Sequence, residues 1–148
     1  MTNRYQKVLL AVDFHEDNAS VVETAKELSE LYSADLHVVH VREPLGLSCA
    51  VDGLSWVDEA YALEERVHKE NKKKMTELGN KLGLAEESCY MLEGRPASVI
   101  LDLSAKGGFD LIVLGTHGQH GLQLLLGCTA NSVLHGSGCD VLAVRIRD

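Results

Sequence analysis

The sequence predicts an α/β protein with a single doubly wound, mainly parallel five-stranded sheet and helices on both faces. Short apolar runs, which suit strands buried on both faces, alternate along the chain with segments of helical periodicity. Gly or Pro marks most junctions between them. The 148 residues, of which 45% are hydrophobic, are enough for one core. We therefore expect one domain over residues 1–148 with a Rossmann-like βαβαβαβαβ order.

The first strand and the first helix follow from a change of hydrophobic period. Lys7–Asp13 is a nearly continuous apolar run that ends in an acid, which is typical of a strand in a parallel sheet. Ser20, with Glu23 three residues later, forms a capping-box pattern that predicts a helix start. Apolar residues at spacings of three and four then continue to Tyr32.

The next strand and helix are separated by an irregular segment. Asp35–Val41 is rich in β-branched residues and predicts the second strand. Residues 43–57 contain Pro44 and show no clear period, so we expect a loop. A long amphipathic helix is predicted over Val57–Leu82, and Gly83 suits its C-terminal stop.

The second half of the chain predicts three more strands and two helices. Glu87–Leu92, Phe109–Gly115 and Asp140–Ile146 are the predicted strands. Helices are predicted at Pro96–Lys106, where Pro occupies the first helical position, and at Gly127–His135. If the first strand is central, the strand order reverses between the first and fourth strands, and ligands bind beyond such ends.

The glycine-rich segment Gly115–Thr129 lies at this expected switch point, opposite Asp13. Glycines let backbone N–H groups approach a ligand, and a helix start adds unpaired donors that favour an anion. The alternative is that the glycines only serve tight turns. From Leu111 to Cys139 there is no Lys, Arg, Asp or Glu, so a nucleotide would be held through backbone donors, with His117 or His120 as a titratable neighbour of phosphate.

Composition and motifs exclude several function classes. The formal net charge of −8 argues against nucleic-acid and membrane-surface partners, and no export signal is apparent, so we expect a cytoplasmic protein. We expect no metal site and no catalytic residue, because no ligand cluster or nucleophile motif is present. The loop lacks the Lys of a phosphate-binding NTPase loop. Enzyme activity stays open, with slow ATP hydrolysis as the most that we expect.

Five segments, in this order, resemble the universal stress protein family. They are Ala11-Val12-Asp13, His40-Val41, Gly94-Arg95-Pro96, Asp110–Gly118 and Val141–Val144. The resemblance runs from Lys7 to Ile146 and implies a single domain of this family over residues 1–148. It also implies a stress-response regulatory protein that binds an adenine nucleotide, ATP or AMP, with or without Mg²⁺.

The resemblance further implies which residues hold the nucleotide. Residues at the ends of the first two strands would flank the adenosine: Ala11, Val12, Asp13 and Val41. Residues of the fourth strand, the glycine-rich segment and the following helix start would line the ribose and phosphates: Leu114, Gly115, Gly118, Gly127, Cys128 and Thr129.

Two departures from the nucleotide-binding signature G-x2-G-x9-G-[ST] keep an alternative open. Only eight residues separate Gly118 from Gly127, and Cys128 replaces the expected hydroxyl residue. The alternative is an interaction module of the same family that binds no nucleotide. In either case, the apolar Val141–Ile146 strand at a sheet edge predicts a homodimer, as the resemblance also implies, with protein partners unknown.

Overall fold

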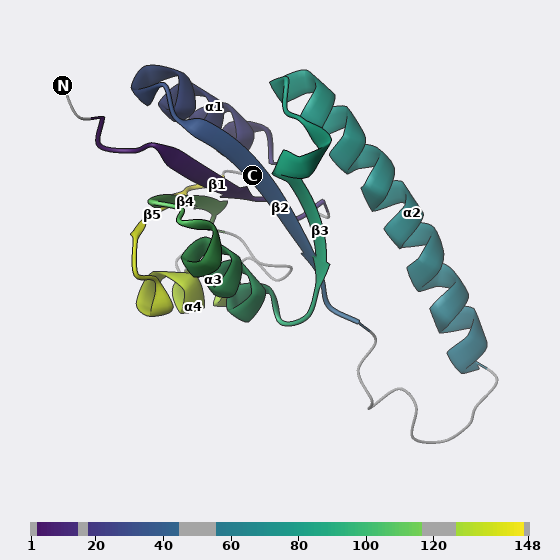
Figure 1. Cartoon of the computed structure of the whole chain (residues 1–148). Coiled ribbons are helices and arrows are strands. Elements are labelled where there is room, and N and C mark those ends of the chain that lie inside the picture. The colour runs from purple at the N-terminus through teal and green to yellow at the C-terminus, as the bar shows by residue number, and fades with distance from the viewer. Residues whose placement is uncertain (1–2, 15–17, 45–55, 117–126, 147–148) are drawn as a thin grey trace.

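The computed structural model describes residues 3–14, 18–44, 56–116 and 127–146, and contains one five-stranded parallel sheet (Figure 1). The strand order is β3-β2-β1-β4-β5. The strands are β1 (Lys7–Ala11), β2 (Asp35–Arg42), β3 (Cys89–Glu93), β4 (Leu111–Gly115) and β5 (Asp140–Val144). The helices are α1 (Ala19–Tyr32), α2 (Trp56–Leu82), α3 (Pro96–Gly107) and α4 (Cys128–Gly136). The predicted fold class is therefore confirmed.

The central position of β1 is confirmed by its register. Val8 is paired with Leu36 of β2 on one side and with Leu111 of β4 on the other. From β1 the chain proceeds outward to β2 and β3, and then returns to the other side of β1 for β4 and β5. The strand order therefore reverses between β1 and β4, which is the switch point expected from the sequence.

Each face of the sheet carries its own apolar cluster, because side chains alternate between the faces along a strand. One cluster contains Val8, Leu10 and Val38 and packs under α1 and α2. The other contains Leu9, Val39 and Ile112 and packs under α3 and α4. Figure 1 shows the sheet between these two pairs of helices. The continuous apolar runs of the central strands follow from burial on both faces.

The predicted capping box at the start of α1 is wrong. The helix begins at Ala19, so Ser20 already lies in its first turn, and Asn18 occupies the N-cap position without a side-chain capping bond. The Asn18 amide instead donates a hydrogen bond to the carbonyl oxygen of Asp13. Asn18 therefore binds the chain that leaves β1 and does not cap the helix with its side chain.

Several strands are shorter than their apolar runs predicted. Asp13, Phe109 and Ile146 lie outside the assigned strands. Ahead of β4, the Asp110 carboxylate accepts hydrogen bonds from the backbone N–H groups of Gln6 and Lys7, at 2.9 and 3.1 Å. The backbone N–H of Asp110 also donates to the Lys7 carbonyl oxygen at 3.0 Å, so Asp110 binds the amino end of β1 through both its backbone and its side chain. A short 3₁₀ turn at Glu86–Ser88 replaces the predicted beginning of the third strand.

Candidate functional site

The carboxyl ends of β1 and β4 form the centre of the candidate site. Leu10 and Val113 are paired across these strands, so Ala11 and Leu114 are the next residues along the same register. Ala11 is half-buried, while Leu114 is only 4% exposed. Both belong to the apolar cluster under α3 and α4, as does the half-buried Val41 at the end of β2. The structure therefore brings these three predicted adenosine and ribose neighbours to one face of the sheet.

Val12 lies on the opposite face from these three residues. Its side chain is 6% exposed and belongs to the cluster under α1 and α2. Its backbone N–H donates to the carbonyl oxygen of Val39 at 3.0 Å, and its own carbonyl oxygen lies 2.9 Å from Nδ1 of His40. Both backbone groups of Val12 are thus bonded within the protein, so Val12 positions the end of β1.

The segment after Val12 is fixed by contacts to three other elements. Asp13 is half-buried, and its carbonyl oxygen accepts the hydrogen bond from Asn18. The Phe14 ring lies 4.9 Å from the His40 ring, centroid to centroid. Lys74 of α2 donates to the Phe14 carbonyl oxygen at 3.5 Å. The candidate site residue Asp13 is therefore presented by backbone anchored to α1, α2 and β2.

Thr116 joins the ends of β4 and β5 to the start of α4. Its backbone N–H donates to the Val144 carbonyl oxygen at 3.0 Å, and its hydroxyl accepts from the N–H of Ile146 at 3.3 Å. The N–H of Gly127 donates to the Thr116 carbonyl oxygen at 2.6 Å. This junction places the first turn of α4 beside the carboxyl end of β4, as the sequence predicts.

The first turn of α4 presents the remaining described residues of the glycine-rich segment. Gly127 is the N-cap residue, Cys128 is exposed and Thr129 is half-buried. A helix start carries N–H groups without intrahelical partners and the positive end of the helix dipole. Gly127 has a φ of −58°, so a left-handed backbone does not explain glycine there. The predicted site residues His117 and Gly118 lie outside the described residues.

Gly115 serves packing on the α1 side of the sheet. A Cβ added there would lie 2.5 Å from Cδ1 of Ile146 and 3.2 Å from Cγ2 of Val21. The interpretation of this glycine as a close approach for ligand is therefore incomplete, because protein side chains already fill the space that its missing Cβ leaves.

Sequence reasoning missed a charged cluster on the α2 side of the same edge. Arg42, the last residue of β2, binds the Glu93 carboxylate through Nη2, and its Nη1 lies 3.7 Å from Oε1 of Glu65. His68 lies one turn further along α2, and burial together with the positive charge of Arg42 lowers its pKa. The spacing of Glu65 and His68 by three residues was the available signal, because such residues share a helix face.

His37 and His40, three residues apart on β2, face opposite sides of the sheet. The His37 Nδ1 lies 3.1 Å from the Tyr90 hydroxyl, and its ring packs edge-on against Phe109 at a centroid distance of 5.1 Å. The His40 ring instead contacts Phe14. Across the part of the chain that the structure describes, no three His, Cys, Asp or Glu side chains are grouped as metal ligands would be.

The described cysteines are free thiols that differ in their exposure to solvent. Cys128 is exposed on α4, whereas Cys89 and Cys139 are half-buried. Burial raises the pKa of the Cys89 thiol, which favours its protonated form.

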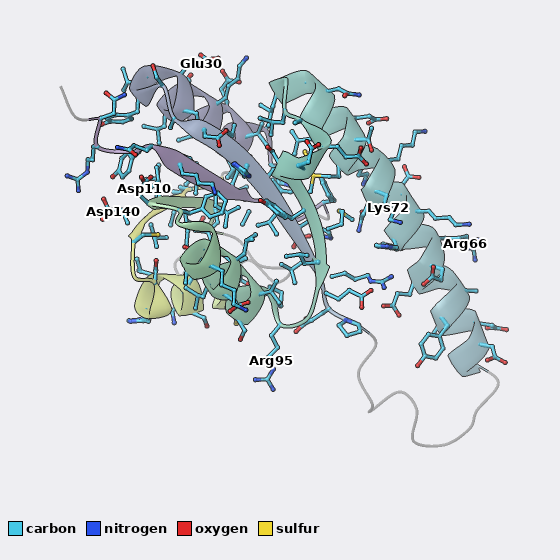
Figure 2. The ribbon with its side chains drawn as sticks, viewed as in Figure 1. Glu30, Arg66, Lys72, Arg95, Asp110 and Asp140 are labelled. Atoms are coloured by element: carbon cyan, nitrogen blue, oxygen red, sulfur yellow. The ribbon has the colours of Figure 1, made fainter. Side chains whose placement is uncertain are left out.

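The exposed Arg95 at the start of α3 extends away from the ribbon, while Asp110 and Asp140 lie at the opposite edge of the sheet (Figure 2).

A parallel, doubly wound sheet with a helix that starts at its switch point defines a class of α/β protein whose ligand sites lie at the carboxyl edge. A sequence profile of the universal stress protein family matches residues 4–145. The chain belongs to the universal stress protein family.

A curated relative agrees with this assignment, and solved structures have the same fold. Universal stress protein A homolog 2 from Coxiella burnetii is 40% identical over 147 residues, covering 98% of each chain. The structure of universal stress protein UspA from Lactobacillus plantarum superposes with a TM-score of 0.70 at 23% identity, covering 97% of this chain and 99% of that one. The structure of a universal stress protein in complex with cAMP superposes with a TM-score of 0.60 at 21% identity, covering 95% of this chain and 96% of that one.

Within the described ranges, no helix combines the length and the apolar character that a membrane crossing requires.

Proposed function

We propose that this chain is a cytoplasmic stress-response regulatory protein that binds an adenine nucleotide beyond the carboxyl ends of β1 and β4. The observation that carries the proposal is the meeting of three features at one edge. Ala11, Val41 and Leu114 share one face, the strand order reverses there, and α4 begins beside β4 through the Thr116 junction. Apolar neighbours suit an adenine ring, and a helix start suits phosphate.

The absence of charged residues from the glycine-rich segment supports nucleotide binding over phosphoryl transfer. No Lys, Arg, Asp or Glu occurs from Leu111 to Cys139, so this segment supplies neither a cationic clamp for a transferring phosphoryl group nor a carboxylate for a metal ion. Backbone N–H groups at the start of α4 would bind the phosphates without activating a nucleophile. A solved family member in complex with cAMP supports an adenine nucleotide as the class of ligand.

Calorimetry with ATP, ADP, AMP and cAMP, each with and without Mg²⁺, tests the proposal. We expect binding of at least one of them, weakened about tenfold or more, or about 1.4 kcal/mol, when Thr129→Ala alters the first turn of α4. The control is Cys139→Ser, a substitution just before β5 at the opposite edge of the sheet. The absence of both binding heat and a thermal shift at millimolar nucleotide would exclude this function.

A second candidate is an interaction module that binds no nucleotide. It is favoured by the Gly127 N–H, which already donates to Thr116, and by the exposed Cys128 where the family signature has a hydroxyl residue. A thiol is a weak donor to phosphate. If Cys128→Ser gains nucleotide binding that the wild type lacks, the module is the better description of the natural chain.

We also propose a homodimer that forms through β5. Among the described residues this strand is paired with β4 on one side only, and the side chains of Val141, Leu142, Ala143 and Val144 are half-buried in the single chain. An apolar edge strand of this kind pairs readily with a second copy. Light scattering at micromolar concentration tests this assembly, and a monomer at all concentrations would contradict it.

A further inference from the structure

The side of α2 that faces the sheet changes character along the helix. In its carboxyl-terminal half, Met75, Leu78 and Leu82 pack against the apolar cluster of the sheet. One and two turns before Met75, the corresponding positions carry Asn71, which is 5% exposed, and the half-buried His68. At these two positions the amino-terminal half therefore places polar side chains where the other half places apolar ones.

Arg42 is the point of attachment for these polar contacts. Its guanidinium binds Glu93 of β3, and its Nη1 lies 3.7 Å from the Glu65 carboxylate of α2. Nε and Nη1 of Arg42 and Nδ1 of His68 are buried and have no hydrogen-bond partner among the described residues. Guanidinium nitrogens can only donate, whereas a neutral imidazole nitrogen can accept. The neutral form of His68 is therefore the one that suits a buried place beside Arg42.

We propose that His68 and Arg42 form a proton-sensitive latch that holds the amino-terminal half of α2 against the carboxyl end of β2. Protonation of His68 turns a nitrogen that can accept into a donor and places a second positive charge beside Arg42, which weakens the attachment of α2 at Arg42 and Glu65. Figure 1 shows this half of α2 running past the ends of β2 and β3, so the release frees a helical segment at the carboxyl edge. The latch does not depend on nucleotide binding.

The charges around His68 determine the direction of the response. Arg42 and His40 on β2 and Lys72 on α2 oppose its protonation, as burial does, whereas Glu65 on α2 favours it. Glu93 at the end of β3 is bound to Arg42. The net effect is a lowered pKa, so the closed state binds fewer protons than the open state. The state with α2 held against β2 therefore loses stability as the pH falls below about 6.5, the ordinary pKa of histidine. The opening equilibrium constant rises by up to about tenfold per pH unit, until the pH has fallen below the lowered pKa of His68.

Two measurements test the latch. The first is the NMR titration of the His68 ring, in which we expect a midpoint below the ordinary value in the wild type and a rise in Arg42→Met. The matched control is Arg66→Met, since Arg66 is exposed on the same helix (Figure 2). An ordinary midpoint in the wild type, or a midpoint that Arg42→Met leaves unchanged, would overturn the proposal.

The second measurement is amide hydrogen exchange over residues 58–70 between pH 8 and pH 5.5, expressed as protection factors. We expect protection to fall toward pH 5.5 in the wild type and to stay nearly constant in His68→Gln, whose amide can accept from Arg42 but does not titrate. His135→Gln, on the exposed end of α4, should behave as the wild type. A parallel loss of protection in the wild type and His68→Gln would show that the latch is wrong, even if Arg42→Met does not fold.

Discussion

Gly115, the last residue of β4, packs against Ile146 so closely that a Cβ on the glycine would lie 2.5 Å from Cδ1 of the isoleucine. Ile146 is 9% exposed and belongs to the cluster under α1 and α2. The chain segment that follows β5 thus returns over the end of β4. This packing fixes the carboxyl edge of the sheet beside the candidate nucleotide site.

Gly115→Ala should destabilise the protein by about 1–3 kcal/mol because the added methyl group overpacks Ile146 and Val21. Urea unfolding measures the change. The matched control is Gly138→Ala, since a Cβ there would meet nothing within 4 Å, and we expect that substitution to change stability by less than about 0.5 kcal/mol. Truncation of the neighbour in the double variant Gly115→Ala/Ile146→Val should recover part of the loss. Equal effects of the two glycine substitutions would contradict the packing role.

Tyr5→Phe should raise the pKa of Asp140. The Tyr5 hydroxyl donates to the Asp140 carboxylate at 2.8 Å, Arg4 pairs with the same oxygen at 2.9 Å, and together they lower the pKa of that carboxyl. With a lowered pKa in the folded state, the contact stabilises the protein above the ordinary value of about 3.9 and is lost as the pH falls below it. A carboxyl NMR titration measures the shift. Tyr61→Phe, on the exposed surface of α2, should leave Asp140 unchanged.

Tyr90→Phe should cost about 1 kcal/mol of stability. The Tyr90 hydroxyl is 3.1 Å from Nδ1 of His37, whose Nε2 is 3.0 Å from the Asp35 carboxylate, so the substitution leaves a largely buried ring nitrogen without its partner. Thermal or urea unfolding at pH 7 is the measurement. No loss relative to the exposed Tyr61→Phe would mean that this hydrogen bond contributes nothing to folding.

Ala143→Glu should weaken the proposed dimer at least about tenfold, or about 1.4 kcal/mol, because a charge on an edge strand opposes pairing with a second copy. Ala143 is half-buried and pairs with Leu114 of β4. Light scattering over a concentration series measures the dissociation constant. Circular dichroism must show that the variant is folded, and an unchanged dissociation constant in a folded variant would place the interface elsewhere.

The sequence predicts the sheet and its switch point because the apolar periods of the central strands are strong. It predicts less well where a side chain bonds to backbone outside its own element. The helix α1 begins before the capping box at Ser20, and Asn18 at its N-cap position binds the Asp13 carbonyl oxygen. Asp110 likewise uses its carboxylate to bind the amino end of β1.

The candidate site was predictable in location but not in the assignment of each residue to a face. Val12 and Val41 are both apolar strand ends, yet they lie on opposite faces of the sheet. The charged cluster of Arg42, Glu65 and Glu93 escaped prediction because its three members come from three elements separated along the chain. The spacing of Glu65 and His68 indicates only that they share a helix face, and no local pattern places Arg42 and Glu93 beside that face.

Thr116 links the proposed nucleotide site at the start of α4 to the proposed dimer interface at β5. Its carbonyl, N–H and hydroxyl groups are bonded to Gly127, Val144 and Ile146, so the start of α4 and the end of β5 meet at a single residue. A ligand that shifts α4 would therefore change the position of the β5 edge, and a second chain bound at that edge would change the position of α4. If nucleotide increases the affinity of dimerisation by some factor, dimerisation must increase the affinity for nucleotide by the same factor.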